Sequence, residues 1–234
     1  MTIYQDPVPK SHGEKGHLPK AVIVANGDIF LSPDDCLEYC GSNILVIAAD
    51  GGLQNCLRLG IQPDVLIGDM DSVSPDQLSQ AGHILKAIYS YPARKEYTDL
   101  ELAMNHAIEQ GATELIILGA LGGRWDMSLS NINLLMSPVL KEKTVRIIDR
   151  HIEIRLITGS DTVSLSGAPG DLLTLIPFGQ PVEGITLSGL AYPLNHETLL
   201  PGTTRGVSNV FKENHVTISV QKGLLLYIHT QVEP

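Results

Sequence analysis

The sequence predicts an α/β N-terminal domain with a mostly parallel, Rossmann-like sheet, followed by an all-β sandwich as the C-terminal domain. In residues 21–149, short apolar runs alternate with segments of helical period, which is typical of parallel strands covered by helices on both faces. In residues 150–234, short runs bounded by Gly, Pro, Ser and Asn follow one another without a helical period, as in sandwiches and partial barrels. The length of 234 residues allows two such domains, since a domain has roughly 150 residues.

The elements of the first part follow from apolar runs that end at turn residues. We expect strands at 21–25, 44–49, 65–67, 84–88, 115–118 and 145–148. We expect helices at 33–40, 51–59, 74–81, 98–110 and 125–140. The helix at 98–110 has the clearest signal, because Thr98 and Glu101 have capping-box spacing, apolar residues recur every three or four positions, and Gly111 follows. The helix at 74–81 begins in the same way, with Ser74 and Gln77 around a proline.

The second part is a series of short strands. We expect them at 152–157, 162–165, 172–176, 185–187, 216–220 and 224–228. The segment Gln221-Lys222-Gly223 predicts a hairpin turn between the last two. The change from alternating helices and strands to strands alone places the domain boundary near Asp149.

The net charge, the hydropathy and the cysteines of the chain limit the classes of function that it can have. A formal net charge of −10 indicates that the chain is no nucleic-acid binder, although a bound divalent metal lets an acidic protein take a phosphorylated ligand. No run reaches the roughly 18 apolar residues of a membrane span. Residues 1–20 lack the apolar core of a signal peptide and are expected to form a flexible leader. Cys36, Cys40 and Cys56 have no His at zinc-ligand spacing and predict reduced thiols in a cytoplasmic protein.

Four acidic residues stand where predicted strands end or a predicted helix begins. Asp50 follows the run at 44–49, Asp69 and Asp71 follow the run at 65–67, and Asp99 lies in the first turn of the helix at 98–110. In an open α/β sheet, ligands bind outside the carboxyl ends of the strands. Because neighbouring carboxylates repel one another and a hard cation relieves this, the set predicts a Mg²⁺ site that faces phosphates. Taken singly, the same residues are also explained as turn or helix-capping residues.

A glycine-rich segment joins the strand at 115–118 to the helix at 125–140. Gly122 and Gly123 precede Arg124, Trp125 and Asp126. Glycines let a backbone approach a phosphate, and a helix N-terminus supplies N–H donors. Arg124 can add a forked contact to phosphate oxygens, and Asp126 can bind a ribose or base or hold Arg124. The segment is neither a dinucleotide fingerprint nor a P-loop, and a tight connection without a ligand also explains it.

A third set of residues lies in the β-rich part. A neutral heteroaromatic ring can stack on Phe211 and be fixed by Ser208 and Asn209. A turn followed by a core phenylalanine is the alternative. Covalent nucleophilic catalysis is not indicated, because the chain has no G-x-S-x-G, H-E-x-x-H or H-R-D motif.

These segments form an ordered series of motifs. The series consists of Asp50-Gly51-Gly52, Gly68-Asp69-Met70-Asp71-Ser72, Lys95-Glu96-Tyr97-Thr98-Asp99, Gly122-Gly123-Arg124-Trp125-Asp126, Gly189-Leu190-Ala191-Tyr192-Pro193-Leu194 and Gly206-Val207-Ser208-Asn209. In this order and spacing, residues 21–230 resemble the thiamine pyrophosphokinase family.

The resemblance implies a catalytic α/β domain at 21–149 and a thiamine-binding β-sandwich at 150–234. It implies that ATP and thiamine react to AMP and thiamine diphosphate with Mg²⁺ as the cofactor. It also implies a homodimer with active sites at the subunit interface.

The resemblance assigns roles by position. It makes Asp69, Asp71 and Asp99 the metal ligands and phosphate-handling acids, with Asp50 close to the reacting groups. The positions on the ATP side are Lys95, Thr98, Gly122, Gly123, Arg124 and Asp126. The thiamine side has Ser208 and Asn209, expected from the partner subunit, and Phe211 as a nearby stacking candidate.

Two positions depart from the family pattern. Glu96 stands where the family usually has Asp, and Met127 stands where it often has His. Two other functions stay open beside this one. A related diphosphokinase for another heterocyclic alcohol would differ in the region 208–211, and a non-catalytic sensor of thiamine or nucleotide would form no AMP.

Overall fold

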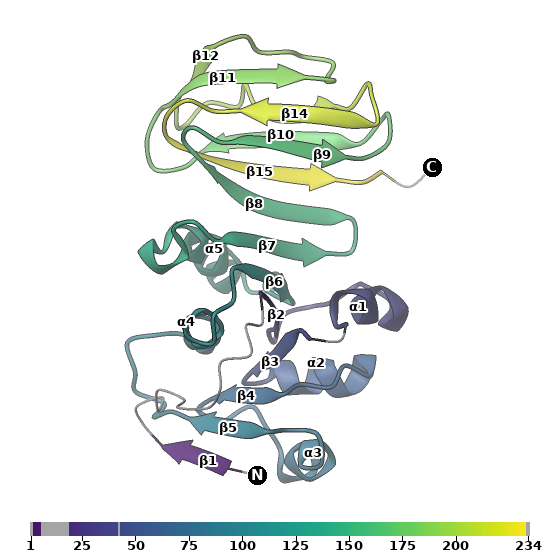
Figure 1. Ribbon diagram of the computed structural model, residues 1–234, viewed down its shortest axis with the longest axis vertical. Helices are drawn as coiled ribbons and strands as arrows, with labels where there is room; N and C mark the ends of the chain where they lie inside the picture. The colour runs from purple at the N-terminus through teal and green to yellow at the C-terminus, as the bar shows by residue number, and fades with distance from the viewer. Residues whose placement is uncertain (1, 6–18, 42, 233–234) are drawn as a thin grey trace. The chain divides into compact units, whose positions relative to one another are not determined.

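The computed structural model describes residues 2–5, 19–41 and 43–232, so most of the expected leader at 1–20 lies outside the described residues. The chain divides into two compact units, Met1–Arg150 and His151–Pro234 (Figure 1).

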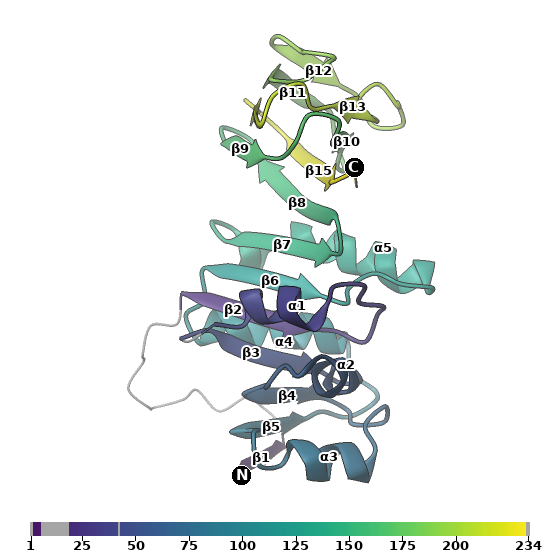
Figure 2. The same cartoon turned by 90° about the vertical axis from the view of Figure 1, so that its right-hand side faces the viewer.

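The first unit is built on seven parallel strands in the order β1-β5-β4-β3-β2-β6-β7, which Figure 2 shows one beside the next. The strands are β1 (Thr2–Gln5), β2 (Lys20–Val24), β3 (Leu45–Ala49), β4 (Val65–Gly68), β5 (Ala87–Ser90), β6 (Glu114–Leu118) and β7 (Thr144–Asp149). The strand order reverses direction between β2 and β6. In sheets of this type, that reversal opens the crevice in which ligands bind.

Helices cover both faces of this sheet. They are α1 (Pro33–Tyr39), α2 (Gly52–Leu59), α3 (Pro75–Ala81), α4 (Asp99–Glu109) and α5 (Trp125–Asn133). Figure 1 shows α1, α2 and α3 on one face and α4 and α5 on the other. The predicted mostly parallel α/β fold is therefore confirmed. None of the helices in the described ranges is long and apolar enough to cross a membrane.

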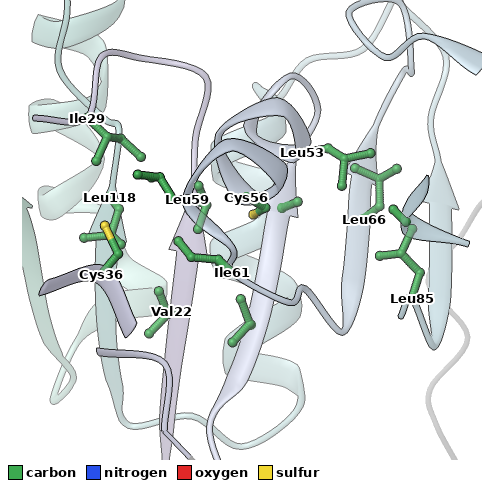
Figure 3. Packing of buried hydrophobic residues seen from close by; sticks show 14 of the residues in the cluster. Val22, Ile29, Cys36, Leu53, Cys56, Leu59, Ile61, Leu66, Leu85 and Leu118 are labelled. Carbon is green, nitrogen blue, oxygen red and sulfur yellow. The ribbon is translucent and has the colours of Figure 1, made fainter. Parts of the chain in front are cut away.

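The core under α1 and α2 shows why these segments fold as they do. Apolar side chains of the strands, among them Val22, Leu66 and Leu118, meet Cys36 of α1 and Leu53 of α2 (Figure 3). All five residues are fully buried. Strands with both faces covered need apolar residues at consecutive positions, which explains the continuous apolar runs in the sequence.

Two elements of the first unit differ from their predicted ranges. The strand expected at 84–88 begins only at Ala87, because the N–H groups of Ile84 and Leu85 donate to Ala81 O and close the end of α3. The helix expected at 125–140 ends at Asn133 and continues as two 3₁₀ turns, η1 (Leu134–Met136) and η2 (Pro138–Leu140). A proline after Ser137 disfavours helical backbone there.

The second unit consists of two antiparallel sheets in the orders β8-β15-β10-β13 and β12-β11-β14-β9. Their strands are β8 (Ile152–Thr158), β9 (Thr162–Ser166), β10 (Leu172–Pro177), β11 (Val182–Ser188), β12 (Glu197–Leu199), β13 (Asn209–Val210), β14 (His215–Ser219) and β15 (Leu224–Thr230). One hydrophobic core takes side chains from both sheets, such as Leu173 and Tyr227 from one and Ile185 and Ile218 from the other. The predicted all-β C-terminal part is confirmed.

The predicted hairpin at Gln221-Lys222-Gly223 is wrong. The strands β14 and β15 on its two sides belong to different sheets. Lys222 instead forms a bridge to Glu183 at the start of β11. The short strands β12 and β13 were also not expected from the sequence.

Candidate functional site

Three of the four predicted acids come together at the carboxyl ends of the strands. Asp50 follows β3, Asp69 follows β4, and Asp99 is the first residue of α4. One carboxylate oxygen from each lies within 4.8 Å of the other two. In the described part of the chain, no other three His, Cys, Asp or Glu side chains meet this way. We call these three residues the acidic cluster.

The backbone around Asp50 is shaped to bring these acids close. The Asp50 N–H donates to Ile67 O at 2.7 Å, which ties the end of β3 to β4. A Cβ atom at Gly68 would lie 2.8 Å from the Asp50 Cβ, and one at Gly52 would lie 2.0 Å from Val24 O. Only glycine fits at these two positions, because a side chain would overlap its neighbours.

Asp50 carries the clearest sign of a missing polar partner. Its side chain is only 8% exposed, and its Oδ1 atom has no hydrogen-bond partner among the described residues. A buried carboxylate oxygen without a partner is costly. An all-oxygen set of three carboxylates that includes such an atom fits a hard divalent cation such as Mg²⁺.

Lys95 offsets part of the charge of the acidic cluster. Its Nζ lies 2.9 Å from Asp99 Oδ1 and 3.4 Å from Asp69 Oδ2, and its side chain is 12% exposed. Burial lowers the pKa of Lys95. The hydrogen bond and charge of Asp99 and the charge of Asp69 together outweigh burial, so the pKa is raised overall. The ammonium therefore stays charged.

The pKa values of the two acids that contact Lys95 are shifted in opposite directions. Burial raises the pKa of Asp99. The contact with Lys95 lowers this pKa, but the negative charges of Asp50 and Asp69 raise it, so the net shift is upward. Burial also raises the pKa of Asp69. There, however, the N–H of Asp71 and the charge of Lys95 outweigh burial, and the pKa is lowered.

Asp71 lies outside the acidic cluster. Its side chain is exposed, and its carboxylate accepts a hydrogen bond from Ser72 Oγ at 2.9 Å. Its N–H donates to Asp69 Oδ1 at 3.2 Å, so Asp71 supports Asp69 through the backbone. Met70 between them has a positive φ of 67°, which makes the turn tight. The three acids that lie together are thus Asp50, Asp69 and Asp99, whereas the predicted metal set is Asp69, Asp71 and Asp99, and that set stays a prediction.

Thr98 caps the helix that carries Asp99. Its Oγ1 accepts a hydrogen bond from the Glu101 N–H at 3.2 Å, which is one half of the capping box that the spacing predicts. Glu96, one of the two departures from the family pattern, is exposed and lies outside the acidic cluster.

The glycine-rich segment joins β6 to α5 as expected. Arg124 makes a forked contact with Asp126, with Nη2–Oδ2 at 2.5 Å and Nε–Oδ1 at 3.3 Å, and both side chains are exposed. Gly122 donates its N–H to Ser128 Oγ at 3.2 Å, so this amide has a partner within the protein. Nothing lies within 4 Å of a Cβ atom built on Gly123, which leaves its backbone open to an incoming group.

The loop after β2 was missed by the sequence analysis. A Cβ atom at Gly27 would lie 2.1 Å from Leu121 O, so this loop touches the glycine-rich segment across the reversal of strand order. Asn55 of α2 holds it by donating to Ala25 O and Gly27 O, each at 2.9 Å. The signal was present, because Asn26-Gly27 directly follows a predicted strand at the sheet edge that binds ligands.

The second unit holds the predicted thiamine-side residues. Ser208 is exposed and has a positive φ of 58°. The Asn209 side chain is buried and fixes the backbone of Tyr192, with Oδ1 accepting from the Tyr192 N–H at 3.0 Å and Nδ2 donating to Tyr192 O at 2.7 Å. The Phe211 ring is 1% exposed and stacks on His229, with centroids 4.8 Å apart. The proposed contact of Phe211 with a ligand stays a prediction.

A cavity of about 290 Å³ lies between these segments of the second unit, and its lining includes Leu187, Tyr192, Arg205, Val207 and Asn209. The Tyr192 side chain is 69% exposed. The Arg205 guanidinium, which also lines the cavity, is paired with Glu197. The aromatic ring beside an apolar wall suits a flat heterocycle.

Comparisons with known proteins match both units. Residues 37–148 match the family described as thiamin pyrophosphokinase, catalytic domain, and residues 160–225 match the thiamin pyrophosphokinase, vitamin B1 binding domain. Thiamine pyrophosphokinase of Bacillus subtilis is 32% identical over 208 residues, which cover 89% of this chain and 97% of the relative. Thiamine pyrophosphokinase 1 of Oryza sativa subsp. japonica is 27% identical over 72% of this chain and 67% of the relative.

Solved structures agree with these sequence matches. The crystal structure of thiamine pyrophosphokinase from Bacillus subtilis superposes with a TM-score of 0.82 at 31% identity and covers 92% of this chain and 100% of that one. The structure of the Geobacillus thermodenitrificans protein has a TM-score of 0.79 at 28% identity, with coverage of 92% and 98%. With a close relative matched over nearly its full length and both family domains found in order, the chain belongs to the thiamin pyrophosphokinase family.

Proposed function

We propose that this chain transfers the pyrophosphoryl group of ATP to the hydroxyl of thiamine, giving thiamine diphosphate and AMP. The observation that carries the proposal is the acidic cluster of Asp50, Asp69 and Asp99 at the strand ends of a catalytic domain of this family. A vitamin B1 binding domain follows in the same chain.

We assign the Mg²⁺ ligands to Asp50, Asp69 and Asp99 on the basis of their geometry, and not to Asp71. When bound, Mg²⁺ offsets the negative charge of the triphosphate and of the leaving AMP. Asp71 keeps an exposed carboxylate next to the cluster, and we assign to it the orientation of the thiamine hydroxyl and the acceptance of its proton. Arg124 and the open backbone of Gly123 are the groups that we expect to hold phosphate oxygens.

ATP binding would use the rest of the expected set. Thr98 keeps the first turn of α4 in place, and Asp126 aims the Arg124 guanidinium through its forked contact. The β-phosphorus has to be held in line with the attacking hydroxyl, because attack at that atom requires the whole triphosphate to be fixed. Lys95 supplies a further positive charge at the cluster.

Thiamine binding would use the second unit. Asn209 sets the position of Tyr192 at the cavity, and Ser208 offers an exposed hydroxyl beside it. The thiazolium ring is positively charged, so an acidic site attracts it.

The test is a direct assay of products. Wild-type protein with ATP, thiamine and Mg²⁺ is expected to form AMP and thiamine diphosphate in equal amounts, measured by liquid chromatography. Asp69→Asn is expected to abolish both products with little change in thermal stability, and Asp76→Asn, an exposed acid in the first turn of α3, is the control that keeps activity. Tight thiamine binding without AMP would indicate a sensor, and faster turnover of another heterocyclic alcohol would indicate a related diphosphokinase.

The homodimer is a separate part of the proposal. If each active site combines the first unit of one subunit with the second unit of the other, two inactive variants can rescue each other. Mixing Asp69→Asn with Asn209→Ala after joint refolding would restore about a quarter of wild-type activity, because half of the dimers are mixed and each mixed dimer has one intact site. No rescue in dimers shown by light scattering to be mixed would place each site within one subunit.

A further inference from the structure

Lys95 uses the same carboxylates that we assign to the metal. Its Nζ contacts Asp99 Oδ1 at 2.9 Å and Asp69 Oδ2 at 3.4 Å. With a side chain that is 12% exposed, Lys95 lies against the acidic cluster and is not a solvated surface lysine. Lys86 is the opposite case, since it pairs with Asp64 at 2.7 Å while its side chain is 78% exposed.

A divalent cation at the acidic cluster and this ammonium would share the carboxylates of Asp69 and Asp99. Charges of the same sign a few ångströms apart repel strongly where water is largely excluded. Lys95 does not satisfy the third acid, because Asp50 Oδ1 has no hydrogen-bond partner in the described part of the chain. A cation that contacts all three acids would therefore have to take Asp69 and Asp99 from Lys95.

We propose that Lys95 is a displaceable internal cation, which holds Asp69 and Asp99 together and is released from them when the metal binds. The released ammonium stays attached to the segment that begins α4 and becomes available to the triphosphate. Lys95 would thus be a positioning residue for the acids before metal binding and a phosphate-binding residue after it. The inference rests on the metal site of the proposed function, but not on the identity of the phosphate acceptor.

The first test measures the release itself in the wild-type protein without ATP. Brief acetylation with acetic anhydride, read by peptide mass spectrometry, reports how accessible each lysine is. Adding Mg²⁺ is expected to raise the labelling rate of Lys95 several-fold and to leave that of Lys86 unchanged, with NaCl of equal ionic strength as the salt control. An unchanged or lower rate at Lys95 at saturating Mg²⁺ would overturn the proposal.

The second test measures the competition by Mn²⁺ binding, followed by the electron paramagnetic resonance of the free ion. Removing the competitor in Lys95→Met is expected to tighten Mn²⁺ binding by about tenfold. It should also lower the melting temperature of the metal-free protein and increase the gain on adding metal. Lys86→Met removes one charge elsewhere in the same unit and is expected to leave the affinity unchanged.

The outcomes separate this inference from the proposed function. In one outcome, the wild-type protein binds Mn²⁺ and Lys95→Met binds it equally well or more weakly. This outcome would overturn the proposal that the metal displaces Lys95, but it would leave the metal site intact. A wild-type protein that binds no Mn²⁺, alone or with ATP, overturns both. If Lys95→Met fails to fold, the acetylation of wild-type protein still decides.

Discussion

Replacing His106 by leucine is expected to make the first unit less sensitive to acid. His106 lies on α4, is 3% exposed, and its Nδ1 has no hydrogen-bond partner among the described residues. Its ring packs against Tyr89 with centroids 4.7 Å apart. Burial lowers the pKa of His106 from 6.5 to about 4. The folded state therefore holds the neutral ring, whereas the unfolded chain takes up a proton below pH 6.5.

The size of the effect follows from this shift. Stability is fully present above pH 6.5 and falls as the pH drops towards 4, because only the unfolded state binds the proton in that range. A pKa shift of this size corresponds to a loss of about 2 kcal/mol at pH 5 and about 3 kcal/mol when the loss is complete.

Urea unfolding at pH 7.5 and pH 5 measures the loss. Circular dichroism at 222 nm follows the first unit selectively, since all described α-helices belong to it. The difference between the two pH values should be about 2 kcal/mol smaller in His106→Leu than in wild type. His83→Gln, at an exposed position, is the control and should keep the wild-type difference. Equal pH dependence in His106→Leu and wild type would refute the reasoning.

Three further outcomes are expected. Asp171→Asn should destabilise the second unit by about 3 kcal/mol in urea unfolding, because it breaks a buried pair with His229; a loss below 1 kcal/mol, roughly that of a surface pair, would contradict this. Ser74→Ala should lower the unfolding free energy of the first unit by about 1 kcal/mol in urea unfolding, since Ser74 Oγ caps α3. Ser74→Thr, which keeps the hydroxyl, is its control. Burial raises the pKa of the Cys36 and Cys40 thiols to about 11, so Ellman's reagent should label them slowly at pH 8 and rapidly after denaturation. Fast labelling of the native protein would disagree.

The acidic cluster shows how much of the candidate site can be predicted from the sequence. The carboxyl ends of parallel strands and the beginnings of the helices that follow them lie at one edge of the sheet, so the meeting of Asp50, Asp69 and Asp99 could be expected from the alternation of strands and helices. Whether Asp50 or Asp71 belongs to the cluster could not be expected from the sequence. It depends on the tight turn at Met70, whose positive φ leaves Asp71 outside the cluster, and no propensity of methionine predicts that conformation.

The errors of the sequence analysis arise from contacts between distant segments. The turn at Gln221–Gly223 has hairpin residues, but a long-range bridge from Lys222 to Glu183 directs the flanking strands into different sheets. For Phe211 the sequence left two interpretations open, and the structure shows the core phenylalanine, whose ring packs on His229. Neither partner lies close in the sequence, so local pattern carries no information on them.

The central position of β2 has a consequence for synthesis on the ribosome. Val22 pairs with Val46 on one edge of β2, but with Ile116, 94 residues further along the chain, on the other. At about 5–20 residues per second, the second edge would stay open for roughly 5–20 s after β2 has been made. An unpaired apolar strand is a template for association with other chains. The nascent protein therefore has a defined interval in which a chaperone, or a neighbouring nascent chain, can reach β2 before its own β6 does.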